Sequence, residues 1–204
     1  MKIPKIKELK EAISAIIQGP YTHPFPAEPT PVPENLRAAP KYDPDYCIGC
    51  GACAEMCPAR AIKVEEFRKN GQTIRKLICN YGNCIFCGEC EYHCTTEKGI
   101  HLTPQYELSY FEPEEALESI EHELVTCEMC QQIIAPKAQL NYLSRQLGPI
   151  AWSNPTVYLT ETKEQGILPK FSVPPDREVW RWDLVRILCP ACRRKVLLKE
   201  QWGY

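Results

Sequence analysis

The sequence predicts an α+β fold in which clustered cysteines hold metal centres. Three observations lead to this prediction. Twelve of the thirteen cysteines fall in C-x-x-C-type runs, a spacing that suits metal binding. Alternating apolar residues flank Asn70-Gly71, which predicts a β-hairpin. Apolar residues recur at helical spacing in residues 3–18, which predicts an amphipathic helix.

Composition excludes several classes of protein. The 204 residues carry 24 basic and 26 acidic side chains, a formal charge of −2, which argues against a nucleic-acid partner because phosphate binding needs clustered Lys and Arg. An odd cysteine count in C-x-x-C runs opposes a secreted disulfide framework and indicates a reducing, cytoplasmic setting. We expect no membrane span, because no run of 18 apolar residues exists, and no signal peptide.

The N-terminal helix is predicted within a segment spanning residues 1–19. Ile6, Leu9, Ile13, Ile16 and Ile17 share one face. Two interpretations remain open from the segment itself: the helix docks on a protein surface, or it lies in a membrane interface.

Residues 20–44 contain eight prolines. Proline fixes φ and interrupts both helices and central strands. We therefore predict an extended arm that lies on other protein surface.

Residues 45–108 form the predicted cluster-binding domain, which includes the hairpin. The run C-x-x-C-x-x-C-x-x-x-C appears twice, first at Cys47, Cys50, Cys53 and Cys57 and then at Cys84, Cys87, Cys90 and Cys94. In such runs the first three cysteines bind one [4Fe–4S] cluster and the last binds the other. The prediction is therefore cluster one on Cys47, Cys50, Cys53 and Cys94, and cluster two on Cys84, Cys87, Cys90 and Cys57. The alternatives are metal-free buried cysteines or zinc, which normally takes two pairs.

Neighbouring residues support the iron–sulfur interpretation. Small residues next to the ligands let backbone N–H groups approach cluster sulfurs: Gly49, Gly51, Ala52 and Gly88. Four isoleucines are expected to cover the clusters: Ile48, Ile62, Ile85 and Ile100. His93 and His101 stand beside ligands and could tune a potential. Cys79 is surplus and is expected to be a small buried hydrophobe.

Residues 109–204 are predicted to hold a second metal region. We expect a helix over 112–125, with Leu117, Ile120 and Leu124 on one face, and a short helix around 136–147. Two C-x-x-C pairs supply four thiolates, in a spacing that resembles a zinc ribbon or a rubredoxin-type knuckle: Cys127, Cys130, Cys189 and Cys192. Zinc is the preferred occupant, followed by a single iron, a third cluster and an empty reduced site.

The chain resembles the two-cluster ferredoxin-like subunit shared by respiratory complex I and group 4 membrane-bound [NiFe] hydrogenases. The resemblance rests on the N-terminal helix, the Pro-rich arm, CIGCGACAEMCPARAI, the Asn-Gly hairpin and NYGNCIFCGEC. The added CEMC and CPAC pairs make it more similar to the formate hydrogenlyase and energy-converting hydrogenase type; sulfur-reducing membrane complexes also have such a subunit.

The resemblance implies a role and partners. It implies an electron relay on the cytoplasmic side of the membrane, bound peripherally, with no catalytic centre of its own. The implied partners are hydrogenase-like or quinone-oxidoreductase-like small and large subunits, a membrane-arm subunit contacted by residues 3–18, and a soluble ferredoxin as donor. It also favours the membrane-interface interpretation of that helix.

The second motif departs from the family pattern. Thr95 follows Cys94 where proline is usual, and one extra residue separates Cys94 from Ile100. We expect the turn after Cys94 to be reshaped.

Three functions would make use of these metal centres. The first is an electron-transfer subunit with two [4Fe–4S] clusters in a hydrogenase-type, sulfur-reducing or complex I-like membrane complex. The second is a free soluble ferredoxin with a metal-binding appendage. The third, an enzyme whose catalytic centre is the C-terminal metal, conflicts with four cysteines closing that site.

Overall fold

The computed structural model describes residues 6–28, 30–33, 35–168 and 180–202 and divides the chain into two units, Met1–Leu36 and Arg37–Tyr204. In the first unit, helix α1 spans Ile6–Gln18 and buries none of its residues; positions 3–5 of the predicted helix lie outside the described residues. Between Gly19 and Leu36, the described residues form neither helix nor strand. No described helix is long and apolar enough to cross a membrane.

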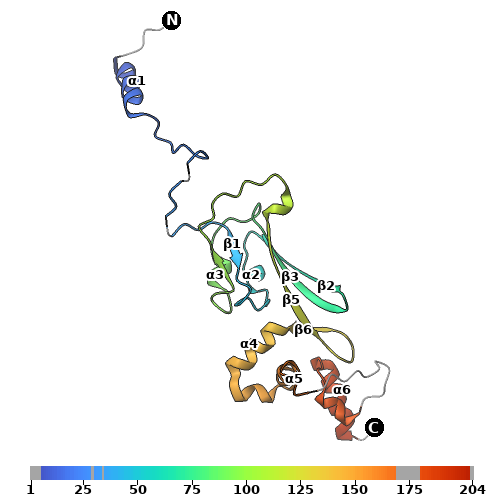
Figure 1. Ribbon diagram of the computed structural model, residues 1–204. Helices are drawn as coiled ribbons and strands as arrows, with labels where there is room; N and C mark the ends of the chain where they lie inside the picture. The colour runs from blue at the N-terminus through green and yellow to red at the C-terminus, as the bar shows by residue number, and fades with distance from the viewer. Residues whose placement is uncertain (1–5, 29, 34, 169–179, 203–204) are drawn as a thin grey trace. The chain divides into compact units, whose positions relative to one another are not determined.

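The second unit begins with the cysteine-rich domain (Figure 1). Strand β1 (Pro40–Tyr42) pairs antiparallel with β4 (Ile100–Leu102). Two short helices, α2 (Ala52–Glu55) and α3 (Glu89–Tyr92), each bury the third cysteine of one motif. The ends of the domain are therefore fastened together around the two cysteine motifs.

The predicted hairpin is confirmed. Strands β2 (Ile62–Lys69) and β3 (Gln72–Asn80) pair antiparallel throughout. Asn70 and Gly71 both have positive φ, 53° and 81°, the combination that matches a two-residue turn to the twist of the strands.

The prediction of a helix over residues 112–125 is wrong. A 3₁₀ turn, η1 (Pro113–Ala116), leads into strand β5 (Leu117–Thr126), which pairs with β3. Side chains alternate along β5, with Ile120, His122 and Leu124 turned inward and their neighbours exposed. Apolar residues at 117, 120 and 124 satisfy a helical spacing, but the open edge of β3 offers a complete row of backbone partners.

A four-stranded sheet of order β2-β3-β5-β6 therefore joins the cysteine-rich domain to the C-terminal region. Strand β6 spans Ile133–Pro136 and pairs with the end of β5. Figure 1 shows β3 and β5 side by side, with the C-terminal helices following β6. The sheet carries residues of the C-terminal half to the first cysteine motif.

The C-terminal helices pack into two small cores. The predicted helix around 136–147 is confirmed as α4 (Lys137–Leu147). It is followed by η2 (Gly148–Ser153), α5 (Pro155–Glu164), η3 (Arg181–Val185) and α6 (Pro190–Trp202). Leu140, Ala151 and Val157 form one core. Leu188 and Val196 form the other with three of the four C-terminal cysteines: Cys127, Cys189 and Cys192.

Candidate functional site: three cysteine centres

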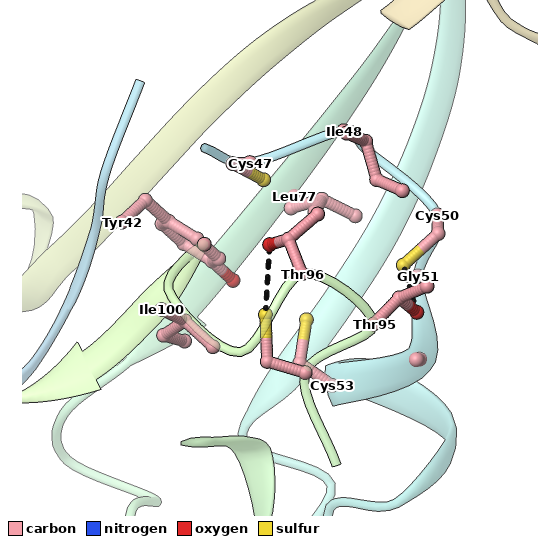
Figure 2. A pocket seen from close by; sticks show the side chains of 13 residues that line it. Tyr42, Cys47, Ile48, Cys50, Gly51, Cys53, Leu77, Thr95, Thr96 and Ile100 are labelled. Atoms are coloured by element: carbon pink, nitrogen blue, oxygen red, sulfur yellow. Dashed lines mark hydrogen bonds between the residues drawn. The ribbon is translucent and has the colours of Figure 1, made fainter. Parts of the chain in front are cut away.

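Pocket one gathers cysteines from both motifs (Figure 2). Its lining includes Cys47, Cys50 and Cys53 of the first motif and Cys94 of the second. Tyr42, Ile48, Leu77, Thr95, Thr96 and Ile100 complete most of the wall. The four cysteines are those that the sequence analysis groups as cluster one.

Pocket two is the counterpart. Its lining includes Cys84, Cys87 and Cys90 of the second motif with Cys57 of the first. Cys79 also lines it and is completely buried. Of the isoleucines expected to cover the clusters, Ile62 lines this pocket and is buried, whereas Ile85 lines it but is 62% exposed.

The two motifs share one backbone geometry. Gly51 and Gly88 stand in the left-handed region immediately before α2 and α3. The equivalent positions Gly49 and Phe86 also have positive φ, 67° and 53°. Position 86 tolerates a side chain, but a Cβ on Gly49 would lie 2.8 Å from the His122 ring. Glycine at 49 thus makes room for a residue of β5.

The turn after Cys94 keeps the geometry of the turn after Cys57. In each, the N–H three residues later donates to the cysteine carbonyl, from Arg60 at 3.1 Å and from Glu97 at 2.9 Å. Arg60 and Glu97 both have positive φ, 50° and 61°. The expectation that this turn is reshaped is therefore wrong for its first four residues, because the internal hydrogen bond closes it without proline. The extra residue is accommodated between Glu97 and Ile100.

Side-chain groups reach three sulfurs of pocket one. The Thr95 hydroxyl lies 3.3 Å from Cys50 Sγ and the Thr96 hydroxyl 3.4 Å from Cys94 Sγ, both drawn dashed in Figure 2. His122 Nε2 lies 3.3 Å from Cys47 Sγ. When these sulfurs carry negative charge, the two hydroxyls and a protonated Nε2 donate to them.

The histidine that matters here is His122, which sequence reasoning missed. His93 forms an exposed ion pair with Glu89, 3.3 Å apart, and His101 is exposed on β4. His122 is brought to Cys47 by strand pairing across 75 residues, and the predicted helix hid it. Burial, with the nearby Arg75 cation, lowers the pKa of His122, which favours the neutral ring.

Burial also makes two thiols of pocket one, Cys47 and Cys53, poor acids. It raises the pKa of Cys53 to about 12 and of Cys47 to about 11, and neighbouring thiolates add to the effect. Adjacent buried thiolates therefore need a cationic group between them. Tyr42 Oη is buried in pocket one next to the Cys53 thiol. It has no partner of good hydrogen-bond geometry among the described residues, and Figure 2 shows it directed toward the sulfurs. A sulfide-rich iron cluster fits both the thiols and this unused donor.

The third centre is the C-terminal group of four cysteines, Cys127, Cys130, Cys189 and Cys192. Their ligand atoms all lie within 4.8 Å of one another, with Cys130 Sγ 3.7 Å from Cys189 Sγ. The first pair lies on a tight turn closed by Gln131 N–H donating to Cys127 O at 2.9 Å. The second pair lies at the start of α6.

The distances between cysteine sulfurs distinguish this centre from the two pockets. Four ligands about 2.3 Å from a tetrahedral ion stand about 3.8 Å apart, which agrees with the 3.7 Å separation. In the part of the chain that the structure describes, no other group of three or more such ligands is equally close. The eight cysteines of the pockets are thus spread more widely than a single ion requires.

Comparisons with known proteins identify the cysteine-rich domain and its relatives. The 4Fe-4S dicluster domain model matches residues 46–98. Formate hydrogenlyase subunit 6 of Escherichia coli is 36% identical over 124 residues, which cover 61% of this chain and 67% of that protein. NADH-quinone oxidoreductase subunit I 2 of Geobacter metallireducens is 30% identical over 122 residues, covering 56% of this chain and 92% of that protein.

The chain belongs to the family of these two subunits. The resemblance inferred from its motifs is confirmed, and residues 46–98 form a 4Fe-4S dicluster domain. A chain of the archaeal membrane-bound sulfane sulfur reductase also matches, with a TM-score of 0.39 and 28% identity over 57% of this chain and 61% of that chain.

Proposed function

We propose that this protein is an electron-transfer subunit that carries two [4Fe–4S] clusters within a membrane-associated oxidoreductase complex. One observation carries the proposal: each pocket is lined by three cysteines of one motif and the last cysteine of the other. Cys47, Cys50, Cys53 and Cys94 would hold one cluster, and Cys84, Cys87, Cys90 and Cys57 the other. Each bound cluster would accept and release one electron.

The chain's own residues would bind, shield and bias these clusters. Ile48, Ile62 and Ile100 are buried at the pocket walls and exclude water. The backbone N–H groups of Ala61 and Phe86 donate to Cys57 Sγ and Cys84 Sγ at 3.2 and 3.4 Å. Such donors stabilise the negative charge that reduction adds.

The complex is proposed to be of the hydrogenase type, with sulfur-reducing and complex I-like complexes as alternatives. The names of the relatives support this. We propose hydrogenase-like or quinone-oxidoreductase-like small and large subunits as partners, a soluble ferredoxin as donor, and the cytoplasmic face of the membrane as the location. Helix α1 would contact the membrane or its arm, since its apolar face is unburied.

We further propose that the C-terminal cysteines hold zinc. The 3.7 Å sulfur separation suits a mononuclear tetrahedral ion and is too short for thiolates that bind different irons of a cube. The tight turn at Cys127–Cys130 is typical of a zinc ribbon or rubredoxin-type site, which leaves a single iron as the alternative.

Iron and zinc quantitation on the anaerobically purified full-length protein tests both proposals. We expect about eight irons, four for each cluster, one zinc, and low-temperature EPR signals from two interacting clusters on reduction. An iron content near four or below would contradict the two-cluster function. A ninth iron with no zinc would place iron at the C-terminal site.

A further inference from the structure

The internal repeat allows the two pockets to be compared position by position. Pro58 and Ala59 follow Cys57, and Thr95 and Thr96 follow Cys94, in turns of the same geometry. Because each last cysteine joins the other motif's pocket, Ala59 lines pocket two while Thr95 and Thr96 line pocket one. The repeat has therefore placed hydroxyls at one pocket only.

Two further side-chain donors follow the same bias, whereas the backbone N–H groups of Ala61 and Phe86 donate to sulfurs of pocket two. Tyr42 Oη is buried in pocket one beside the Cys53 thiol, and His122 Nε2 lies 3.3 Å from Cys47 Sγ. Arg75 donates to Gly49 O at 3.0 Å and so anchors the loop of the first motif next to His122. Among the described residues that line pocket two, none carries a hydroxyl or an imidazole.

One pair of equivalent positions also differs in charge. Ala52 lines pocket one, and its equivalent in the second motif, Glu89, lines pocket two. A carboxylate beside pocket two disfavours further negative charge there. Its ion pair with His93 is half exposed, so solvent weakens the effect without reversing its sign.

We propose that Tyr42, Thr95, Thr96 and His122 make the cluster in pocket one the higher-potential member of the pair, so that an electron shared by the two sites rests in pocket one. This inference rests on the proposed function. Hydrogen bonds to cluster and cysteine sulfurs stabilise the reduced state, which is more negative by one charge. Electron transfer between the sites would oxidise the cluster in pocket two by one electron and reduce the cluster in pocket one by the same electron. No proton would move.

The experiment is an EPR-monitored redox titration of the loaded full-length protein, with dithionite as the reductant. Replacing Thr95 and Thr96 by valine removes both hydroxyls and keeps the side-chain shape. We expect the ratio of reduced to oxidised cluster at the higher-potential site to fall about tenfold at a fixed potential, which is about 59 mV for a one-electron couple. The lower-potential site should not move.

Two further variants test the assignment of the higher potential to pocket one without relying on the double valine variant. Thr95→Ser with Thr96→Ser keeps the hydroxyls and should titrate like the natural protein. Pro58→Thr with Ala59→Thr transfers the hydroxyls to pocket two and should raise the lower potential, which brings the two transitions together.

Three results would overturn the inference: no change in the valine variant, a shift of the lower transition in that variant, or equal potentials in the natural protein. Iron content separates these results from a failure of the function itself. If the natural protein binds eight irons but the valine variant leaves both potentials unchanged, only the proposed resting place of the electron is refuted. If the natural protein never binds eight irons, the proposed electron-transfer function is refuted.

Discussion

At the scale of single residues, Gly49 is constrained from two directions. Its φ of 67° belongs to the left-handed region, and a Cβ there would meet the His122 ring at 2.8 Å. Gly71 has a φ of 81° with nothing within 4 Å. Substitution of Gly71 would therefore cause backbone strain alone, whereas substitution of Gly49 would add a steric clash.

We expect Gly49→Ala to lower the free energy of unfolding by about 3 kcal/mol, from strain and overpacking together. Gly71→Ala, the control, should cost about 1 kcal/mol from strain alone. Urea unfolding of the loaded protein under anaerobic conditions measures both. Equal losses would mean that His122 moves aside freely.

Cys79 lies at the wall of pocket two but is the surplus cysteine. It is completely buried, and burial raises its pKa, with the Cys84, Cys90 and Cys57 thiolates adding to the effect. We expect Cys79→Ala to cost on the order of 1 kcal/mol and to keep eight irons, whereas Cys57→Ala should lose iron. Iron loss in the Cys79 variant would contradict its assignment as the surplus cysteine, and retention of eight irons in Cys57→Ala would exchange the roles of the two residues.

Tyr81 connects the hairpin to β1 by donating to Pro40 O at 3.0 Å. Burial, then the Glu118 carboxylate, raises its pKa, so its contribution to stability is complete below the ordinary tyrosine pKa of about 10 and is lost as pH rises above it. We expect Tyr81→Phe to cost about 1 kcal/mol at pH 8. The variant should then lose less stability than the natural protein between pH 9 and 11; a parallel loss would show that Tyr81 plays no part in the alkaline response.

At the scale of elements, local pattern predicted the hairpin and α4 but not β5. Asn70-Gly71 admits few conformations, so its turn is readable from two residues. Leu117, Ile120 and Leu124 fit both a helix face and an inward-facing strand with one exposed member, and what decides between them is the edge of β3, a distant partner. His122 was missed for the same reason.

The cysteine groups were predictable because their spacing encodes which thiols meet. The hydroxyl contacts were not, because Thr95 and Thr96 follow Cys94 in sequence but contact a pocket formed mainly by the first motif. The closeness of Cys130 and Cys189 likewise depends on the fold between them.

The C-terminal metal is expected to fasten the β5–β6 turn to α6. Removing zinc with a strong chelator, at constant iron content, should increase hydrogen exchange in Cys127–Cys130 and the first turns of α6, because the metal would take ligands from both segments. A Cys192→Ser variant serves as control and should show the same exchange with and without chelator. Unchanged exchange in the natural protein would contradict a structural metal.

At the scale of the whole molecule, α1 presents an apolar face that no described residue of its own unit covers. Ile6, Ile16 and Ile17 are 87%, 82% and 78% exposed. We expect Ile13→Asp with Ile16→Asp to reduce the membrane-bound fraction tenfold or more, since burying each isoleucine contributes about 1.5–3 kcal/mol. Flotation of the complex with membranes measures this.

The matched control places the same charges on the opposite, exposed face of α1, as Ala15→Asp with Gln18→Asp. This variant should stay with the membrane fraction. If both variants assemble and float like the natural protein, α1 has no role in attachment.

The exchange of cysteines between the two motifs has a consequence for biosynthesis. With the proposed ligand sets, pocket two would need Cys90 as its last thiol and pocket one Cys94, so both sets would be completed within four residues of translation. A nascent chain that ends before Cys90 offers a complete set to neither cluster, however long its first motif has been outside the ribosome. Assembly factors that deliver iron and sulfide would therefore meet one acceptor that becomes competent almost at once, and not two sites that mature in sequence.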